Sequence, residues 1–109
     1  MEIKKNIRVG DRIRFVDFVC DMCEKDGKQY YALFDYAWRI AVITFFAPEA
    51  ELDKMDTDEM CDFVYSRQGV EIVEDPDIAV VTAGLYEACE AEMKDRKEKY
   101  KIGRASCRE

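Results

Sequence analysis

The chain contains no histidine, only two prolines and five glycines, and no long apolar segment. Without histidine it lacks the commonest general base and any serine–histidine or cysteine–histidine nucleophile, so we expect a protein that is not an enzyme. Its longest apolar run, residues 40–47, contains Thr44 and is too short for a membrane span. The N-terminus, Met-Glu-Ile-Lys-Lys, has no apolar signal region. We therefore expect a soluble, cytoplasmic protein that is not secreted.

The 109 residues are 49% hydrophobic, which is enough for one domain with its own core. Residues 102–109 match the translation of a common sequencing adapter, and Lys101 fits the same reading frame. We therefore expect a single globular domain over residues 1–101 and a non-native, adapter-derived tail over residues 102–109. On this interpretation the DNA was shotgun-sequenced, and the true C-terminus beyond Lys101 cannot be read from this sequence.

Apolar residues recur with helical period, which predicts a mainly α, compact four-helix domain. The first helix is capped by Asp11 and ends near Asp26 and Gly27, and the second, residues 33–47, is buried and stops at Pro48. Its β-branched part, residues 40–44, also fits a strand. The third, of about three turns, begins around Asp56.

The last helix is opened by Asp75 and Pro76. The sequence does not decide the structure of two further segments. Residues 70–73 fit either a short strand or a helical turn, and residues 3–9 fit a short N-terminal strand. A small β element of this kind makes an α+β fold the alternative to the mainly α fold.

Cys20 and Cys23 are spaced so that their thiols could share a zinc ion or form a redox disulfide. A zinc site of four thiolates would also need Cys61 and Cys89, because there is no histidine. A redox pair normally sits at a helix N-terminus, whereas this pair lies near the end of its helix. We therefore favour reduced cysteines buried in the core, with no cofactor, over zinc binding and over redox activity.

Acidic residues dominate the second half: residues 47–92 carry fourteen of them against only Lys54 and Arg67. Such a block either keeps a small domain soluble or binds a basic partner. Acids at helix starts also stabilise their own helices, but they do not explain the shortage of lysine. The candidate partner-binding residues follow Pro48: Glu49, Glu51, Asp53, Asp56, Asp58, Glu59 and Asp62.

Basic residues gather only at the two ends of the chain. Part of the C-terminal group is explained by favourable pairs four residues apart, such as Glu92 with Arg96 and Asp95 with Lys99. We therefore expect no direct nucleic-acid binding. The aromatic residues Tyr30, Tyr31, Phe34 and Trp38 could stack on bases but are expected in the core.

Four segments, residues 15–23, 31–37, 42–46 and 62–65, resemble small proteins encoded by phages and prophages of Gram-positive bacteria. In size, acidity and apparent shotgun origin the chain is also similar to certain anti-CRISPR proteins from metagenomes. Several of these block an RNA-guided nuclease by occupying its DNA-binding groove. The resemblance implies a non-enzymatic binding protein in the bacterial host cytoplasm. Its partner would be a basic nucleic-acid-binding protein, and a Cas9-type nuclease is the most specific form of this expectation.

The implied mechanism is DNA mimicry, in which the candidate carboxylates occupy the lysines and arginines that normally hold phosphates. Such binding should weaken steeply with salt. The resemblance also implies a second possibility, a virion structural or assembly accessory protein of the tail or head. That protein would bind a sibling phage protein through apolar helix faces.

Overall fold

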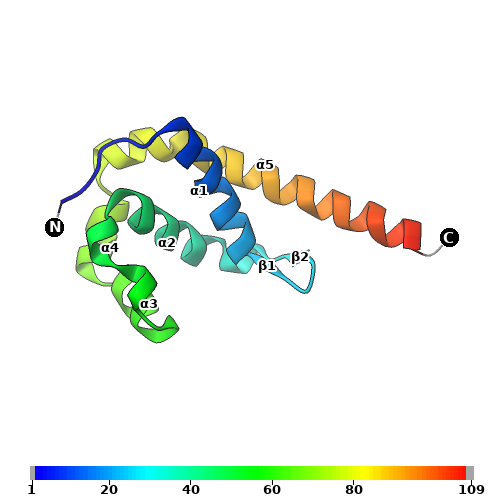
Figure 1. Ribbon diagram of the computed structural model, residues 1–109, viewed down its shortest axis with the longest axis horizontal. Coiled ribbons are helices and arrows are strands. Elements are labelled where there is room, and N and C mark those ends of the chain that lie inside the picture. Colours follow the sequence, from blue (N-terminus) through cyan, green and yellow to red (C-terminus); the bar gives the residue numbers. More distant parts are fainter. Residues whose placement is uncertain (1, 108–109) are drawn as a thin grey trace.

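The computed structural model describes the backbone of residues 2–107 and the side chains of residues 2–99. It is mainly α with one small β element, as the sequence predicts (Figure 1). The helices are α1 (Val9–Met22), α2 (Phe34–Phe46), α3 (Thr57–Val64), α4 (Arg67–Val73) and α5 (Pro76–Cys107). The strands are β1 (Glu24–Lys25) and β2 (Lys28–Gln29), and three 3-10 turns are η1 (Tyr31–Leu33), η2 (Pro48–Ala50) and η3 (Leu52–Lys54).

The core forms around α2, which packs against α1 on one side and against α3 and α4 on another. Phe15 of α1 is fully buried, with its ring centroid 5.2 Å from Trp38 and 5.4 Å from Phe45. Residues 40–44, for which a strand was the alternative, are helical and belong to α2. Burial on nearly all sides explains why β-branched residues are accepted there, because packing outweighs their weak strand preference.

The first helix ends earlier than predicted. It stops at Met22, and Asp26 and Gly27 instead form the turn of the β1–β2 hairpin. Both residues have positive φ, 54° and 78°, as a tight two-residue hairpin turn requires. An Asp-Gly pair is a strong hairpin signal, so this turn was visible in the sequence.

The start of α1 also differs from the prediction. Asp11 is not its cap, because the helix begins two residues earlier at Val9 and its N-cap, Arg8, makes no side-chain capping bond. Asp11 lies in the first turn, where a carboxylate still favours the helix dipole, and it pairs with Arg14 at 3.4 Å.

The predicted N-terminal strand over residues 3–9 is absent. Residues 2–8 run as an extended segment, in which the amide of Lys4 donates to the carbonyl of Phe46 at 2.7 Å. Lys5 reaches the start of α5, where its Nζ lies 2.9 Å from Asp75 and 3.5 Å from Asp77. The segment is therefore held by separate contacts to two helices and not by a strand ladder.

The described residues form five α-helices where four were predicted, because residues 70–73 belong to α4. The hydroxyl of Ser66 caps this helix by accepting from the amide of Gly69 at 3.2 Å. Gly69 is buried against the end of α3 and allows the two helices to meet closely.

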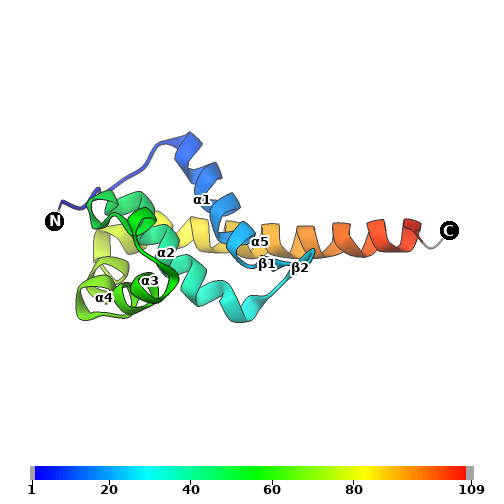
Figure 2. The ribbon, with the colours of Figure 1, turned by 60° about the horizontal axis from the view of Figure 1, so that its bottom comes forward.

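The last helix, α5, is the longest element and projects past the rest of the fold (Figure 2). It continues beyond Lys101 through residues 102–107 of the expected adapter-derived tail. Residues 108 and 109 of that tail lie outside the described residues. Among the helices of the described chain, none combines the length and the apolar character that crossing a bilayer demands.

Candidate acidic binding surface

The seven candidate carboxylates lie between the end of α2 and the end of α3, which we call the acidic segment (residues 49–62). All seven side chains are exposed. Pro48 opens η2, and Glu51 then turns the chain with a left-handed φ of 54° before η3. The short turns keep the carboxylates at the surface, because Ala50 and Leu52 between them are buried.

Two of the carboxylates form a reciprocal cap on α3. Asp56 accepts from the amide of Glu59 at 2.8 Å, and Glu59 accepts from the amide of Asp56 at 3.2 Å. This capping box stabilises the helix by satisfying two amides that have no partner within it. Asp56 and Glu59 therefore have a structural role that is sufficient to explain their presence.

Glu49 and Glu51 also have local partners. Glu49 accepts from the amide of Glu2 at 3.0 Å, and Glu51 lies 3.2 Å from Nζ of Lys54. In the part of the chain that the structure describes, Asp53, Asp58 and Asp62 make no ion pair or side-chain hydrogen bond. These three are the best-placed carboxylates for contact with another molecule.

Asp58 and Asp62 are four residues apart on α3 and therefore share a face. Two like charges at this spacing destabilise the helix slightly, by about 0.2–0.5 kcal/mol. Asp58 lies in the first turn of α3, where the helix dipole favours a carboxylate, whereas Asp62 near the end of the helix has no such role.

The acidic surface is held in place by contacts between α2 and the end of α3. The hydroxyl of Tyr65 donates to Asp35 at 2.9 Å, and Nε of Arg39 donates to the same oxygen at 3.0 Å. The Arg39 guanidinium also lies 5.0 Å from the centre of the Tyr65 ring. Partial burial raises the pKa of Tyr65, and the hydrogen bond to Asp35 raises it further. Sequence reasoning missed this network, although the four-residue spacing of Asp35 and Arg39 was a visible signal.

Two of the remaining acids of the block, Asp75 and Asp77, pair with Lys5 of the N-terminal segment. Asp75 caps α5 by accepting from the amides of Asp77 and Ile78 at 2.9 and 3.2 Å. The hydrogen bond from Lys5 lowers the pKa of Asp75, and the bond to Asp75 raises the pKa of Lys5. Among the described residues Glu74, Glu87 and Glu90 are also exposed without an ion pair, but they are spread over the end of α4 and α5, whereas Asp53, Asp58 and Asp62 lie close together in the chain.

Three of the four candidate zinc ligands are buried core residues, as favoured from the sequence. Cys20, Cys23 and Cys89 have no exposed surface, whereas Cys61 on α3 is exposed, so the core prediction is wrong for Cys61. Burial raises the pKa of Cys20 to about 11 and that of Cys89 to about 12, which favours the thiol over the metal-binding thiolate. No group of three or more suitable ligands comes together within the described residues.

Thiol labelling will separate these cysteines. In protein with Cys107 replaced by serine, a thiol reagent at neutral pH should label Cys61 rapidly. Cys20, Cys23 and Cys89 should react slower by orders of magnitude, because burial keeps them protonated and shielded. The measurement is the time course of labelling, with Cys61→Ser as the control. Rapid labelling of any thiol in that control would contradict this arrangement.

At each end of the chain some basic residues are paired within the fold and others are not. Arg96, four-fifths buried, bonds to Asp21 at 2.7 Å, to Asp17 at 3.4 Å and to Glu92 at 3.1 Å. Partial burial lowers its pKa, but the bonds to Asp21 and Glu92 outweigh burial and the net shift is upward. Arg96 therefore clamps α1 to α5. Ion pairs are also made by Lys5, Arg14 and Lys99, whose side chains are exposed. Lys4, Arg8, Lys94 and Lys97 are exposed and make no ion pair among the described residues.

The predicted aromatic core is only half right. Phe34 is buried and Trp38 half-buried, and both contact Tyr86 with ring centroids 5.0 and 5.1 Å apart. Tyr30 and Tyr31 are instead exposed, because η1 carries them to the surface ahead of α2.

Comparisons of the chain with protein-family models, with curated proteins and with solved structures give no match.

Proposed function

We propose that the protein is a non-enzymatic binding protein that recognises a basic partner through the acidic segment. The observation that carries the proposal is the set of exposed carboxylates at Asp53, Asp58 and Asp62, which have no partner among the described residues. Carboxylates held on short turns and a capped helix offer fixed negative charge to lysines and arginines of another protein.

The partner that fits this surface best is a protein that normally binds nucleic acid, because its basic groove already pairs with regularly spaced negative charge. Occupation of that groove would displace DNA or RNA by charge mimicry. A phage-encoded, anti-CRISPR-like inhibitor of a Cas9-type nuclease is the specific form of this proposal, with the inhibitor acting in the cytoplasm of the bacterial host.

Charge reversal tests the proposal without disturbing the caps. Asp53→Lys, Asp58→Lys and Asp62→Lys together should weaken inhibition of DNA binding by a Cas9-type nuclease roughly 10- to 100-fold, for three contacts of about 0.5–1 kcal/mol each. The measurement is anisotropy of labelled target DNA on the guide-loaded nuclease, at low and high salt. Wild-type inhibition should fall steeply with salt, and the variant should have lost most of that dependence.

The matched control reverses three exposed acids of α5, Glu87, Glu90 and Glu98, which changes the net charge equally. This control should inhibit like the wild type. If both triple variants lose inhibition to the same degree, net charge and not the acidic segment is responsible. If neither does, or the wild type does not inhibit, the partner is of another class.

A second function, virion assembly, is favoured by apolar side chains exposed on α1 and α5. Val9 and Ile13 are 75% and 63% exposed, and Val80 is 79% exposed. Such residues suit contact with a sibling phage protein. Binding that is insensitive to salt and lost in Ile13→Lys would support this function over charge mimicry.

A further inference from the structure

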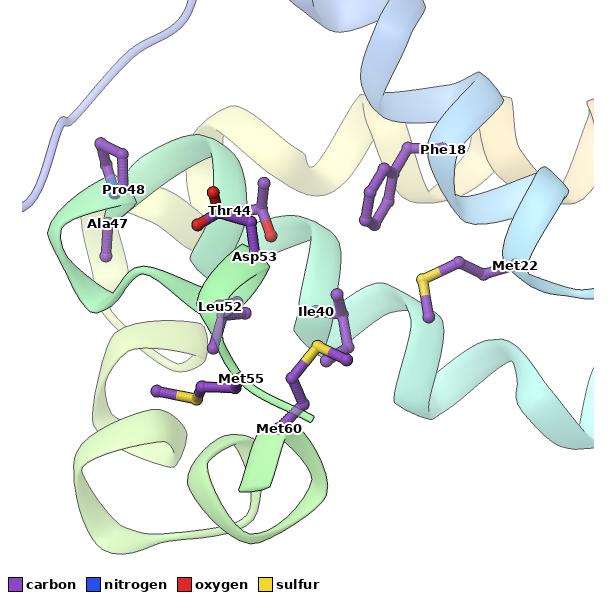
Figure 3. Close-up of a pocket in the computed structure, with 10 residues that line it drawn as sticks. All are labelled: Phe18, Met22, Ile40, Thr44, Ala47, Pro48, Leu52, Asp53, Met55 and Met60. Atoms are coloured by element: carbon purple, nitrogen blue, oxygen red, sulfur yellow. The ribbon is translucent and has the colours of Figure 1, made fainter. Parts of the chain in front are cut away.

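An apolar hollow of about 380 Å³ lies beside the acidic segment, between α1, α2 and α3 (Figure 3). We call it the methionine groove, and it is lined by Phe18, Met22, Ile40, Thr44, Ala47, Pro48, Leu52, Asp53, Met55 and Met60. The almost fully buried side chains of Ile40, Ala47 and Leu52 form its floor. Phe18 and Met22 come from α1 and Met60 comes from α3, so different helices supply its walls.

The walls are adaptable and incompletely covered. Phe18, Met22, Met55 and Met60 are half-buried, so each keeps part of its apolar surface open. Methionine is flexible and polarizable, and it is common on surfaces that fit apolar side chains of varied shape. The groove is thus suited to receive large apolar side chains.

The charge at the rim selects among apolar partners. Asp53 is both a lining residue and an exposed carboxylate without a partner among the described residues. Glu49 adjoins Pro48, and Asp56 lies one turn before Met60 on the same side of α3. Among the side chains that the structure describes, no lysine or arginine lines the groove. A partner that fills it should therefore carry basic residues beside its apolar ones.

The geometry of the groove favours a helical partner. It is built from helices, 3-10 turns and their connections, so it offers no strand edge for an extended peptide to join. A helix with apolar residues at positions i, i+3, i+4 and i+7 presents one apolar face with charged residues on either side.

We propose that the methionine groove receives the apolar face of a basic amphipathic helix of the partner protein. The inference rests on the proposed function and adds its apolar half: the acidic segment attracts the partner, and the groove holds it. Asp53, at the rim, contacts both the charged and the apolar part of such a helix.

The test uses a synthetic helix of leucine and lysine, about 18 residues long so that it is helical when bound. Methyl NMR of methionine should show shifts at Met22, Met55 and Met60 on titration. Met93, which is fully buried in α5 and does not line the groove, is the internal reference and should not move.

Two further peptides serve as controls. One has the same leucines and lysines in simple alternation, and the other keeps the lysines but replaces leucine with serine. We expect both to bind at least tenfold more weakly than the helical peptide. Equal binding of the alternating peptide, or methionine shifts that depend on protein concentration without any peptide, would overturn the proposal. The second result would show that another copy of the chain fills the groove.

Single variants locate the binding in the groove. Met60→Lys and Met22→Lys, on α3 and α1, should each weaken binding of the helical peptide at least tenfold, while Met60→Leu should retain it. Val80→Lys is the matched control, because Val80 is exposed on α5 outside the groove. Full binding by both groove variants, with their helical content intact by circular dichroism, would refute the inference.

The two proposals fail in different ways. If the reversal of Asp53, Asp58 and Asp62 abolishes peptide binding but both groove variants leave it intact, recognition by the acidic segment is supported and the groove is not a docking site. If the groove variants abolish binding and the charge reversal has no effect, docking in the groove is supported and recognition by charge is refuted.

Discussion

Gly69→Ala is expected to lower the free energy of unfolding by about 3 kcal/mol, the upper end of the usual range for overpacking. A Cβ at this position would overlap the carbonyl oxygen of Phe63 and lie 2.9 Å from Cα of Val64. These are backbone atoms at the end of α3, and the Phe63 carbonyl already accepts bonds from the amide and hydroxyl of Ser66. They cannot repack as a flexible side chain would, so α3 and α4 must separate. Thermal unfolding should show a midpoint roughly 12–24 °C lower.

Gly84 provides the matched control, because its added Cβ would meet nothing within 4 Å. Gly84→Ala, in the middle of α5, should raise stability by about 0.5–1 kcal/mol through its better helix propensity. Unchanged stability of Gly69→Ala would mean that the close contact between α3 and α4 is not part of the fold.

Phe15→Ala should cost about 3–5 kcal/mol, the range measured for removal of a buried aromatic ring. Phe15 is fully buried and packs edge-on against Trp38, so its loss opens a cavity between α1 and α2. Urea denaturation followed by Trp38 fluorescence will measure the change, and the emission of the folded variant should shift because the indole loses this neighbour.

Ile13→Ala is the control on the same helix, since Ile13 is 63% exposed, and it should change stability by less than about 0.5 kcal/mol. A similar cost for both variants would show that α1 does not pack through Phe15.

The sequence was sufficient where a single short motif decides the local structure. Asp56 with Glu59 marks the start of α3, and Pro76 marks the start of α5. It was insufficient where two signals competed. Residues 70–73 fitted either a strand or a helical turn, but Ser66 caps a helix that includes them, and its close contact with α3 requires Gly69.

The acidic segment could be predicted as exposed, because charged residues avoid burial. The local partners of its carboxylates could not all be predicted, since the amide that Glu49 binds belongs to Glu2, 47 residues earlier in the chain. The methionine groove could not be predicted from the sequence either. Its lining comes from α1, α2, α3 and the turns between α2 and α3, and their meeting depends on how the helices pack.

The attachment of the N-terminal segment decides where reporter groups can be placed on this protein. The bonds from Glu2 to Glu49 and from Lys4 to Phe46 bring the first residues beside the acidic segment. An affinity tag fused there would emerge next to the surface under test, and a polyhistidine tag would add a pH-dependent positive charge to it. The molecule is 55 Å long, and the far end of α5 lies at its opposite end (Figure 1). Tags and fluorophores attached there leave the acidic segment unobstructed.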